Sequence, residues 1–183
     1  MRLVRYTLLL VSLVGGAGCP GEGDDDITPD GPLPVAELQA GSAALDGTGF
    51  VDVQSGQVVD LIAGAQGGFH VWINVKVFGA EGDLGLEREA TKVSDGTLVL
   101  AGLTAPISVP HDAMLDWWEN PQAPPSFMCP TPIGVSIVDE EIRIAVKLKS
   151  ATGTVLGEDE VVVTPHCAAG DNHDWCQTIC SGM

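Results

Sequence analysis

The side chains with the widest chemical scope in this chain are its histidines and a methionine close to one of them. His111 and Met114 lie three residues apart, and imidazole with thioether is a ligand combination that binds copper in β-sandwich proteins. Such a site usually has a cysteine in the same loop, and no cysteine lies between these two residues. A small exported copper- or zinc-binding protein or enzyme that uses His70, His111 and Met114 is therefore the alternative hypothesis. The preferred hypothesis is a module with no metal, no cofactor and no catalytic residue.

A second candidate is a segment in which aromatic and polar side chains alternate with β-branched ones. In residues 71–77 every second residue is Val or Ile, as in a strand with one buried face. The opposite face then carries His70, Trp72 and Asn74, which suit a ligand that is bound by stacking and hydrogen bonds. They also suit a structural brace, with Trp72 beneath a proline-rich loop and His70 hydrogen-bonded to a backbone carbonyl. We expect the brace and keep the three residues as a possible ligand face for a small ligand or a protein partner of unknown identity.

Four cysteines lie in the last third of the chain, at Cys129, Cys167, Cys176 and Cys180. An even number of cysteines in an exported chain predicts two disulfides. The tail cysteines and His173 also make a possible zinc ligand set, but no Cys-x-x-Cys pair is present. We therefore predict disulfides at all four positions, with the pairing left open, and a Cys-rich tail over residues 167–183.

Other kinds of chemistry have no support in the sequence. There is no Gly-x-Ser-x-Gly elbow, and no glycine loop followed by Lys and Ser or Thr. The chain has 25 acidic and 8 basic residues, a net charge of −17. Removal of a leader containing Arg2 and Arg5 leaves six basic residues against 25 acidic ones, a net charge of −19. A surface this acidic repels phosphate backbones, so we expect no nucleic-acid partner.

Short segments of alternating hydrophobicity must position these side chains. Residues 142–149 alternate most regularly, with a large aliphatic residue at every second position. We predict an all-β domain over residues 35–166: an antiparallel β-sandwich, immunoglobulin-like or fibronectin-like, with a disulfide-linked C-terminal tail. A jelly roll is the alternative. The other predicted strands are 38–43, 49–53, 58–63, 86–93, 97–102, 133–138 and 155–164.

Residues 110–132 interrupt the strand pattern with six prolines and with the aromatic residues Trp117, Trp118 and Phe127. These aromatic side chains either fold back over the core as a lid or form an exposed contact surface. We favour the lid, because a single domain seldom leaves two adjacent tryptophans in water. One or two helical turns are expected at 112–118.

The N-terminus indicates where the protein resides. Two arginines precede an apolar run at 8–14, and three small residues precede Cys19, an order typical of a secretory signal. The segment resembles the lipobox of bacterial lipoproteins. The resemblance implies that residues 1–18 are removed as a signal peptide and that Cys19 carries the lipid. It further implies a protein of the cell envelope, anchored to the outer membrane on its periplasmic or surface face.

Residues 19–34 are rich in Gly, Pro and Asp and have little to bury, so we expect a disordered acidic tether. The stretch 66–72 resembles one that recurs in uncharacterised exported proteins, and this resemblance implies an exported β-sandwich with no particular chemistry. Together these features predict a membrane-anchored exported lipoprotein that acts as a structural or binding module.

Overall fold

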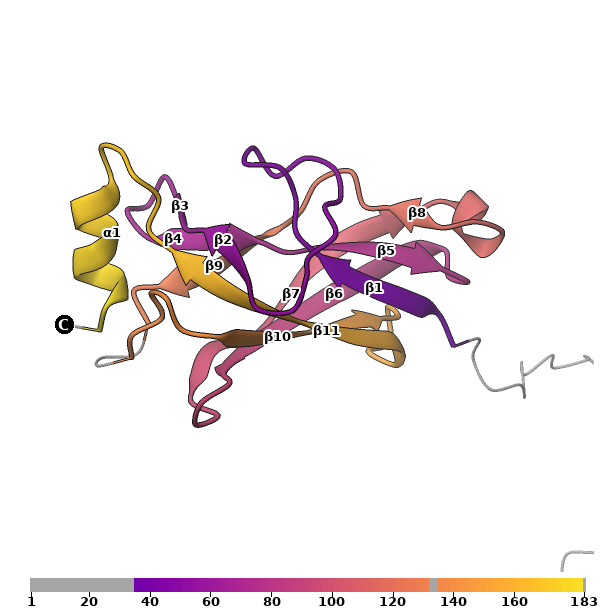
Figure 1. Cartoon of the computed structure of the whole chain (residues 1–183). Helices are drawn as coiled ribbons and strands as arrows, with labels where there is room; N and C mark the ends of the chain where they lie inside the picture. Colours follow the sequence, from indigo (N-terminus) through magenta and orange to yellow (C-terminus); the bar gives the residue numbers. More distant parts are fainter. Residues whose placement is uncertain (1–34, 132–134, 183) are drawn as a thin grey trace, which may run out of the picture. The chain divides into compact units, whose positions relative to one another are not determined.

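The structure is a computed structural model that describes residues 35–131 and 135–182 (Figure 1). The chain divides into two units, Met1–Pro32 and Leu33–Met183. All described residues belong to the second unit, so the fold is that of this unit alone.

Several sequence predictions lie outside the described residues. They are the signal peptide at 1–18, the lipidation site Cys19, the tether at 19–34 and the first two residues of the predicted strand 133–138. These stay predictions.

One layer of the domain is a five-stranded sheet. Its strands are β2 (Gln57–Asp60), β6 (Gly82–Lys92), β7 (Leu98–Val109), β10 (Ile142–Lys149) and β11 (Val155–His166). They lie in the order β2-β11-β10-β6-β7. All neighbours are antiparallel except β2, which pairs parallel with β11.

The other layer consists of two three-stranded sheets. Its strands are β1 (Glu37–Gly41), β3 (Ile62–Ala63), β4 (Phe69–Trp72), β5 (Asn74–Phe78), β8 (Trp118–Glu119) and β9 (Pro125–Cys129). The two sheets have the orders β1-β5-β8 and β3-β4-β9. Because only Ile73 separates β4 from β5, the two small sheets share one central strand course.

The core lies between the layers and follows the predicted alternation. In β10 the fully buried apolar residues are Ile142, Ile144, Val146 and Leu148, and between residues 71 and 77 they are Val71, Ile73, Val75 and Val77. Both sets belong to one buried cluster, so the two layers pack face to face. Each such side chain contributes about 1.5–3 kcal/mol of transfer free energy. The prediction of a mostly β chain in packed layers is confirmed.

Some predicted strands differ from the observed ones. Residues 49–53 make only an isolated bridge, between Ser42 and Val51, and residues 135–138 are not a strand. The strand predicted at 97–102 extends to Val109 as β7. It passes through Pro106, which is tolerated because β7 is an edge strand and one row of its N–H groups needs no ladder partner.

The proline-rich segment contains more regular structure than predicted. It forms a 3₁₀ helix, η1 (His111–Met114), and the short strands β8 and β9. Its aromatic residues have different environments. Trp118 packs against the core, whereas Trp117 and Phe127 are each 43% exposed. The predicted lid is therefore correct for Trp118 only.

The tail forms a helix, α1 (His173–Cys180), that was not predicted from the sequence. Eight residues are too few for a helix to be stable alone in water, so α1 depends on its attachment to the sandwich. It lies at the end of the domain where β3, β4 and β9 meet (Figure 1). In the described part of the chain, no helix has the length and apolar character needed to cross a bilayer.

Candidate functional site

The predicted ligand face lies on the β4–β5 strand course. His70, Trp72 and Asn74 alternate along it with the buried residues of the core. Successive side chains of a strand point to opposite faces, so these three share the face away from the core. Their environments there are different.

Asn74 is fully buried and its side-chain amide is occupied. Its Nδ2 donates hydrogen bonds to the backbone carbonyls of Gly49 (2.6 Å) and Asn120 (2.7 Å). Its Oδ1 accepts one from Nδ2 of Asn120 (2.9 Å). A side-chain amide has only two N–H donors, and both are used here. Asn74 is therefore a structural brace, as preferred from the sequence, and it does not belong to the alternative ligand face of His70, Trp72 and Asn74.

His70 is 5% exposed and is surrounded by rings. The ring of Trp72 lies edge-on at 4.3 Å between centroids, and that of Phe127 at 5.6 Å. Neither imidazole nitrogen has a hydrogen-bond partner among the described residues, so the predicted bond to a backbone carbonyl is wrong. Burial lowers the pKa of His70 below its ordinary value of 6.5, which keeps the ring neutral.

Trp72 is half-buried and holds a loop in place. Its Nε1 donates a hydrogen bond to the carbonyl of Leu45 (3.0 Å). The loop comes so close at Gly47, where φ is +82°, that a Cβ atom there would lie 3.1 Å from the indole. Glycine suits both the left-handed backbone and the close approach. Trp72 thus braces this loop, in addition to any contact with the proline-rich segment.

Trp72 also borders two hollows on the surface. The larger one has a volume of about 500 Å³ and is lined by Trp72, Pro106, Ile107, Ser108, Asn120, Pro121, Gln122, Ala123, Pro124 and Pro125. The smaller one has about 160 Å³ and includes Asp60 and Gln57. Every lining residue of the larger hollow is uncharged, and it combines an aromatic ring with side-chain amide and hydroxyl groups. Such a surface suits a neutral ligand.

The structure does not bring together the histidines of the alternative metal hypothesis. His70 lies near the start of the β4–β5 course, whereas η1, which carries His111 and Met114, is held beyond its end by the bond from Gly79 N–H to the carbonyl of Ala113 (2.8 Å). Nine residues of strand span about 30 Å, far more than two ligands of one metal ion allow. Copper or zinc binding by these three residues is therefore contradicted. Within residues 35–131 and 135–182, no group of three His, Cys, Asp or Glu side chains is placed to hold a metal ion.

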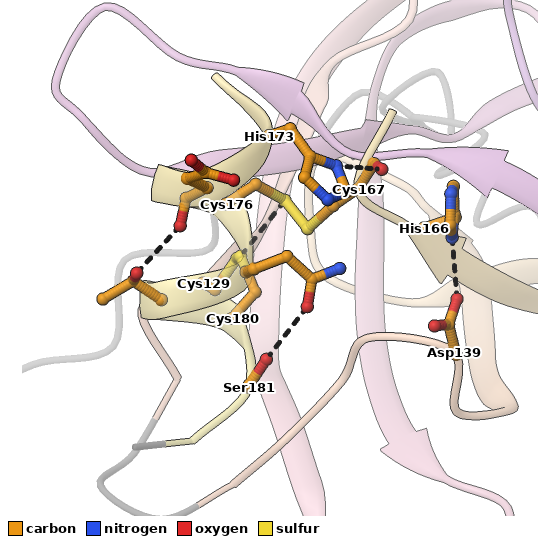
Figure 2. The surroundings of a disulfide bond; sticks show 11 residues. Cys129, Asp139, His166, Cys167, His173, Cys176, Cys180 and Ser181 are labelled. Atoms are coloured by element: carbon orange, nitrogen blue, oxygen red, sulfur yellow. Dashed lines mark hydrogen bonds and ion pairs between the residues drawn. A yellow bond between two sulfur atoms is a disulfide. The ribbon is translucent and has the colours of Figure 1, made fainter. Parts of the chain in front are cut away.

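The remaining histidines have local partners. His111 pairs with the carboxylate of Glu81, which raises the pKa of the imidazole. His166 pairs with Asp139 at 2.8 Å (Figure 2). Nδ1 of His173 lies 3.0 Å from the carbonyl of Cys167.

The four cysteines form two disulfides, as predicted, and the structure supplies the pairing: Cys129 with Cys180 and Cys167 with Cys176. Cys129 ends β9 in the layer made of two three-stranded sheets, and Cys167 follows β11 in the five-stranded sheet. The two bonds therefore attach α1 to both layers at the same end of the sandwich (Figure 2). All four sulfur atoms are engaged, which rules out the tail zinc set in this oxidised protein.

Further contacts seat α1. The Trp175 indole donates to the carbonyl of Gly67 (3.2 Å), and the Ile137 N–H donates to the carbonyl of Cys180 (3.0 Å). The four cysteines are themselves buried in the core cluster.

No family model matches this chain, and no curated protein matches it.

Arg88 is a buried charge that was not predicted from the sequence. It lies in β6, is 1% exposed and points across the core. Its Nη1 donates to the carbonyls of Pro124 (2.9 Å) and Pro125 (3.0 Å) and to Oγ of Ser126 (3.1 Å). Because burial disfavours the charged form, the pKa of Arg88 falls to about 10. The arginine thus links β6 in one layer to the start of β9 in the other, beside the larger hollow.

A signal for Arg88 is present in the sequence. Residues 84, 86 and 90 of β6 are the aliphatic, inward-facing positions, and Arg88 falls in the same register. A charged residue at an inward position predicts a buried polar network. Asn120 and Gln122 had no such signal, because they lie in an irregular segment with no periodicity.

Proposed function

We propose that this chain is an exported lipoprotein of the cell envelope, anchored to the outer membrane through a lipid on Cys19, that acts as a binding module and not as an enzyme. The lipobox-like sequence that ends at Cys19 supports the anchor. Residues 1–18 would be removed, and the 16 residues from 19 to 34 would connect the lipid to the domain. Fully extended, such a tether reaches about 55 Å.

The main support for export of the protein is the pair of disulfides at the end of the sandwich. Both bonds are buried and join α1 to the two layers. The bacterial cytosol keeps thiols reduced, whereas compartments beyond the inner membrane oxidise them. A tail of this kind keeps its position only where the bonds persist.

We also propose that the sandwich is immunoglobulin-like or fibronectin-like. The support is the strand order. We take β4–β5 and β8–β9 each as one strand. The layer made of two three-stranded sheets then holds strands A (β1), B (β4–β5) and E (β8–β9). The five-stranded sheet holds G (β11), F (β10), C (β6) and an added C′ strand (β7). In constant-type immunoglobulin domains the fourth strand joins A, B and E instead. The parallel pairing of β2 with β11 places a continuation of the first strand beside the last one.

The binding surface that we propose is the larger hollow at Trp72, and the ligand class is a neutral, polar molecule with a flat apolar face, such as a sugar ring. Indole and proline surfaces support stacking against such a face. The exposed amide of Gln122 and the hydroxyl of Ser108 line the same hollow. Ser108 Oγ already donates to Asp83 (3.0 Å) and Gln122 Nε2 donates to the carbonyl of Asp46 (3.4 Å), so the ligand would bond to the remaining N–H of Gln122, to its Oε1 and to the lone pairs of Ser108. No lining residue is charged, and the nearby carboxylate of Asp83 disfavours anionic ligands.

The anchor is tested by replacing the acylated residue. The full chain is expressed in a bacterium fed radiolabelled palmitate, and labelled protein is followed in membranes washed with high salt. We expect the wild type to be labelled and to stay in the membrane pellet, because buried acyl chains supply the affinity. Cys19→Ser should lose the label and enter the soluble fraction. A Cys19→Ser protein that stays in the washed pellet would contradict the anchor.

The binding surface is tested on an array of neutral glycans. We expect the wild type to bind a subset of them and Gln122→Ala to lose at least tenfold in affinity. Gln177→Ala on α1 is the matched control and should bind like the wild type. Absence of binding to every neutral glycan, or equal binding by Gln122→Ala, would contradict a sugar ligand at this hollow.

A further inference from the structure

Apolar side chains are exposed at the end of the domain where the described chain begins. Leu115 is 81% exposed and Trp117 is 43% exposed, and Val35 and Val155 are exposed as well. Trp117, Val35 and Val155 line one open hollow of about 690 Å³, and Leu115 lies two residues before Trp117. We call these four residues the base surface.

The start of β1, the end of β5 and β8 lie at the end of the sandwich opposite α1 (Figure 1). Glu37 of β1 pairs with Phe78 at the end of β5, and the ring of Trp117 lies 5.9 Å from that of Phe78. At the start of β4, Phe69 pairs with Cys129, which is bonded to α1. The strand course between Phe69 and Phe78 spans about 30 Å.

The start of the described chain is held against β11 beside the base surface. The N–H of Ala36 donates to the carbonyl of Leu156 (2.8 Å), and a Cβ atom on Gly157 would lie 2.5 Å from the carbonyl oxygen of Ala36. The first described residues are therefore packed on β11. The chain leaves the domain at the base surface and nowhere near α1.

We propose that the base surface lies against a zwitterionic phospholipid surface, with Leu115 and Trp117 as its main apolar contacts. This inference rests on the proposed anchor at Cys19. A tether of 16 residues keeps the domain within about 55 Å of the bilayer, so a weak apolar contact is favoured by a high effective concentration. Tryptophan is enriched at the membrane–water interface, where its ring and its N–H are both accommodated.

The charges around the base surface decide which lipid it contacts. Glu37, Asp116 and Glu158 are exposed and lie within or next to it. Carboxylates are repelled by anionic headgroups, with a range of about 8 Å at physiological ionic strength. The base surface should therefore contact phosphatidylethanolamine or phosphatidylcholine and withdraw from a strongly anionic bilayer.

The test is quenching of tryptophan fluorescence by lipids that carry bromine on their acyl chains. The acylated mature protein, residues 19–183, is reconstituted in zwitterionic vesicles with and without brominated lipid. Trp117 is one of four tryptophans, so we expect quenching to approach one quarter of the emission. Trp117→Phe should abolish the quenching. Trp175→Phe, which removes a tryptophan that is 52% exposed on α1, should leave it intact.

A second pair of variants tests the contact without removing a fluorophore. Leu115→Ser should reduce the quenching at least twofold, while Leu103→Ser on the exposed edge of β7 should not change it. Replacing half of the lipid by phosphatidylglycerol should also reduce it. Equal quenching of the wild type and Trp117→Phe, or no quenching of either protein, would overturn the inference. The base surface would then contact a protein, the tether or water instead of lipid.

The anchor and the base surface can fail separately. Flotation of the protein with the vesicles reports the anchor. If the isolated protein carries no acyl chain, the full chain is coupled to a maleimide lipid through Cys19, since the four other cysteines are held in disulfides. Quenching of Trp117 in that coupled protein would support the base surface although the proposed anchor had failed. Its absence there would overturn the base surface as well.

Discussion

Asn120 donates a hydrogen bond from its side-chain amide to Oδ1 of Asn74 over 2.9 Å, and Asn74 donates one from its own amide to the backbone carbonyl of Asn120 over 2.7 Å. Both residues are buried. This reciprocal pair ties β5 to the segment between β8 and β9, which forms one wall of the larger hollow at Trp72. The wall is thus set by a buried polar contact within the protein, independently of any ligand.

Replacing Asn120 by alanine should destabilise the protein. The substitution leaves Oδ1 of Asn74 and the carbonyl of Gln122 without the donor that Asn120 provides. An unpaired buried polar atom costs about 1–3 kcal/mol, so we expect Asn120→Ala to lower the free energy of unfolding by about that amount in urea titrations. Asn172→Ala, at an exposed position before α1, is the control. Equal midpoints for the two variants would contradict the bracing role.

Acidification should destabilise the protein through His70. Its folded-state pKa is below 6.5 because the ring is buried, so on acidification the unfolded chain takes up the proton first. The stabilising effect of the neutral ring is complete above pH 6.5 and is lost as the pH falls below it, by at most about 1.4 kcal/mol per pH unit. Urea midpoints between pH 7.5 and 5.0 should therefore fall more steeply for the wild type than for His70→Phe.

The pH dependence that His111 contributes to stability has the opposite direction to that of His70. Its pKa is raised by Glu81, so its contribution is fully present below pH 6.5 and is lost as the pH rises through the raised value. Because His111 is unchanged in both proteins, its effect cancels in the comparison between the wild type and His70→Phe. Parallel pH profiles for the two proteins would show that His70 is not the group responsible.

Arg88→Ala should be more destabilising than the loss of any single surface charge. It empties a buried site and removes three hydrogen bonds that join the layers. Emptying a large buried site costs about 2–5 kcal/mol, and here it also leaves the two carbonyls and the hydroxyl without their donor. Arg143→Ala is the matched control: Arg143 lies on the outer face of β10 and pairs with Glu160 at 3.4 Å, an exposed ion pair worth less than about 1 kcal/mol. Chemical denaturation of both variants measures the difference.

The layers and their core were predictable, because alternation of side-chain types is a local property of the sequence. Ile142 and Val75 are apolar at positions that share a face with other apolar residues, and both are fully buried. Two turns are local features in the same sense: Gly96 has φ +73° and Gly153 has φ +85°, the left-handed conformation that glycine adopts freely.

The braces were not predictable, because they depend on which segments meet. Asn74 and Asn120 are 46 residues apart, and no local pattern joins them. The strands β8 and β9 lie in a segment whose prolines suggest a loop, and they form because the β4–β5 course offers an open edge to pair with. The helix α1 has little apolar content and is attached through Cys180 to Cys129, 51 residues earlier in the chain, a pairing that no local pattern indicates.

The two disulfides should contribute unequally to stability. The bond between Cys129 and Cys180 joins residues 51 positions apart, and that between Cys167 and Cys176 joins residues 9 apart. A disulfide lowers the entropy of the unfolded chain by an amount that grows with the logarithm of the number of residues in the closed loop. The expected stabilisation is about 4 kcal/mol for the first bond and about 2.6 kcal/mol for the second. Denaturation of the double variants Cys129→Ala/Cys180→Ala and Cys167→Ala/Cys176→Ala, with intact mass verifying that the remaining pair is oxidised, measures both. A larger loss for the shorter loop would mean that α1 is held mainly by its packing and not by restriction of the unfolded chain.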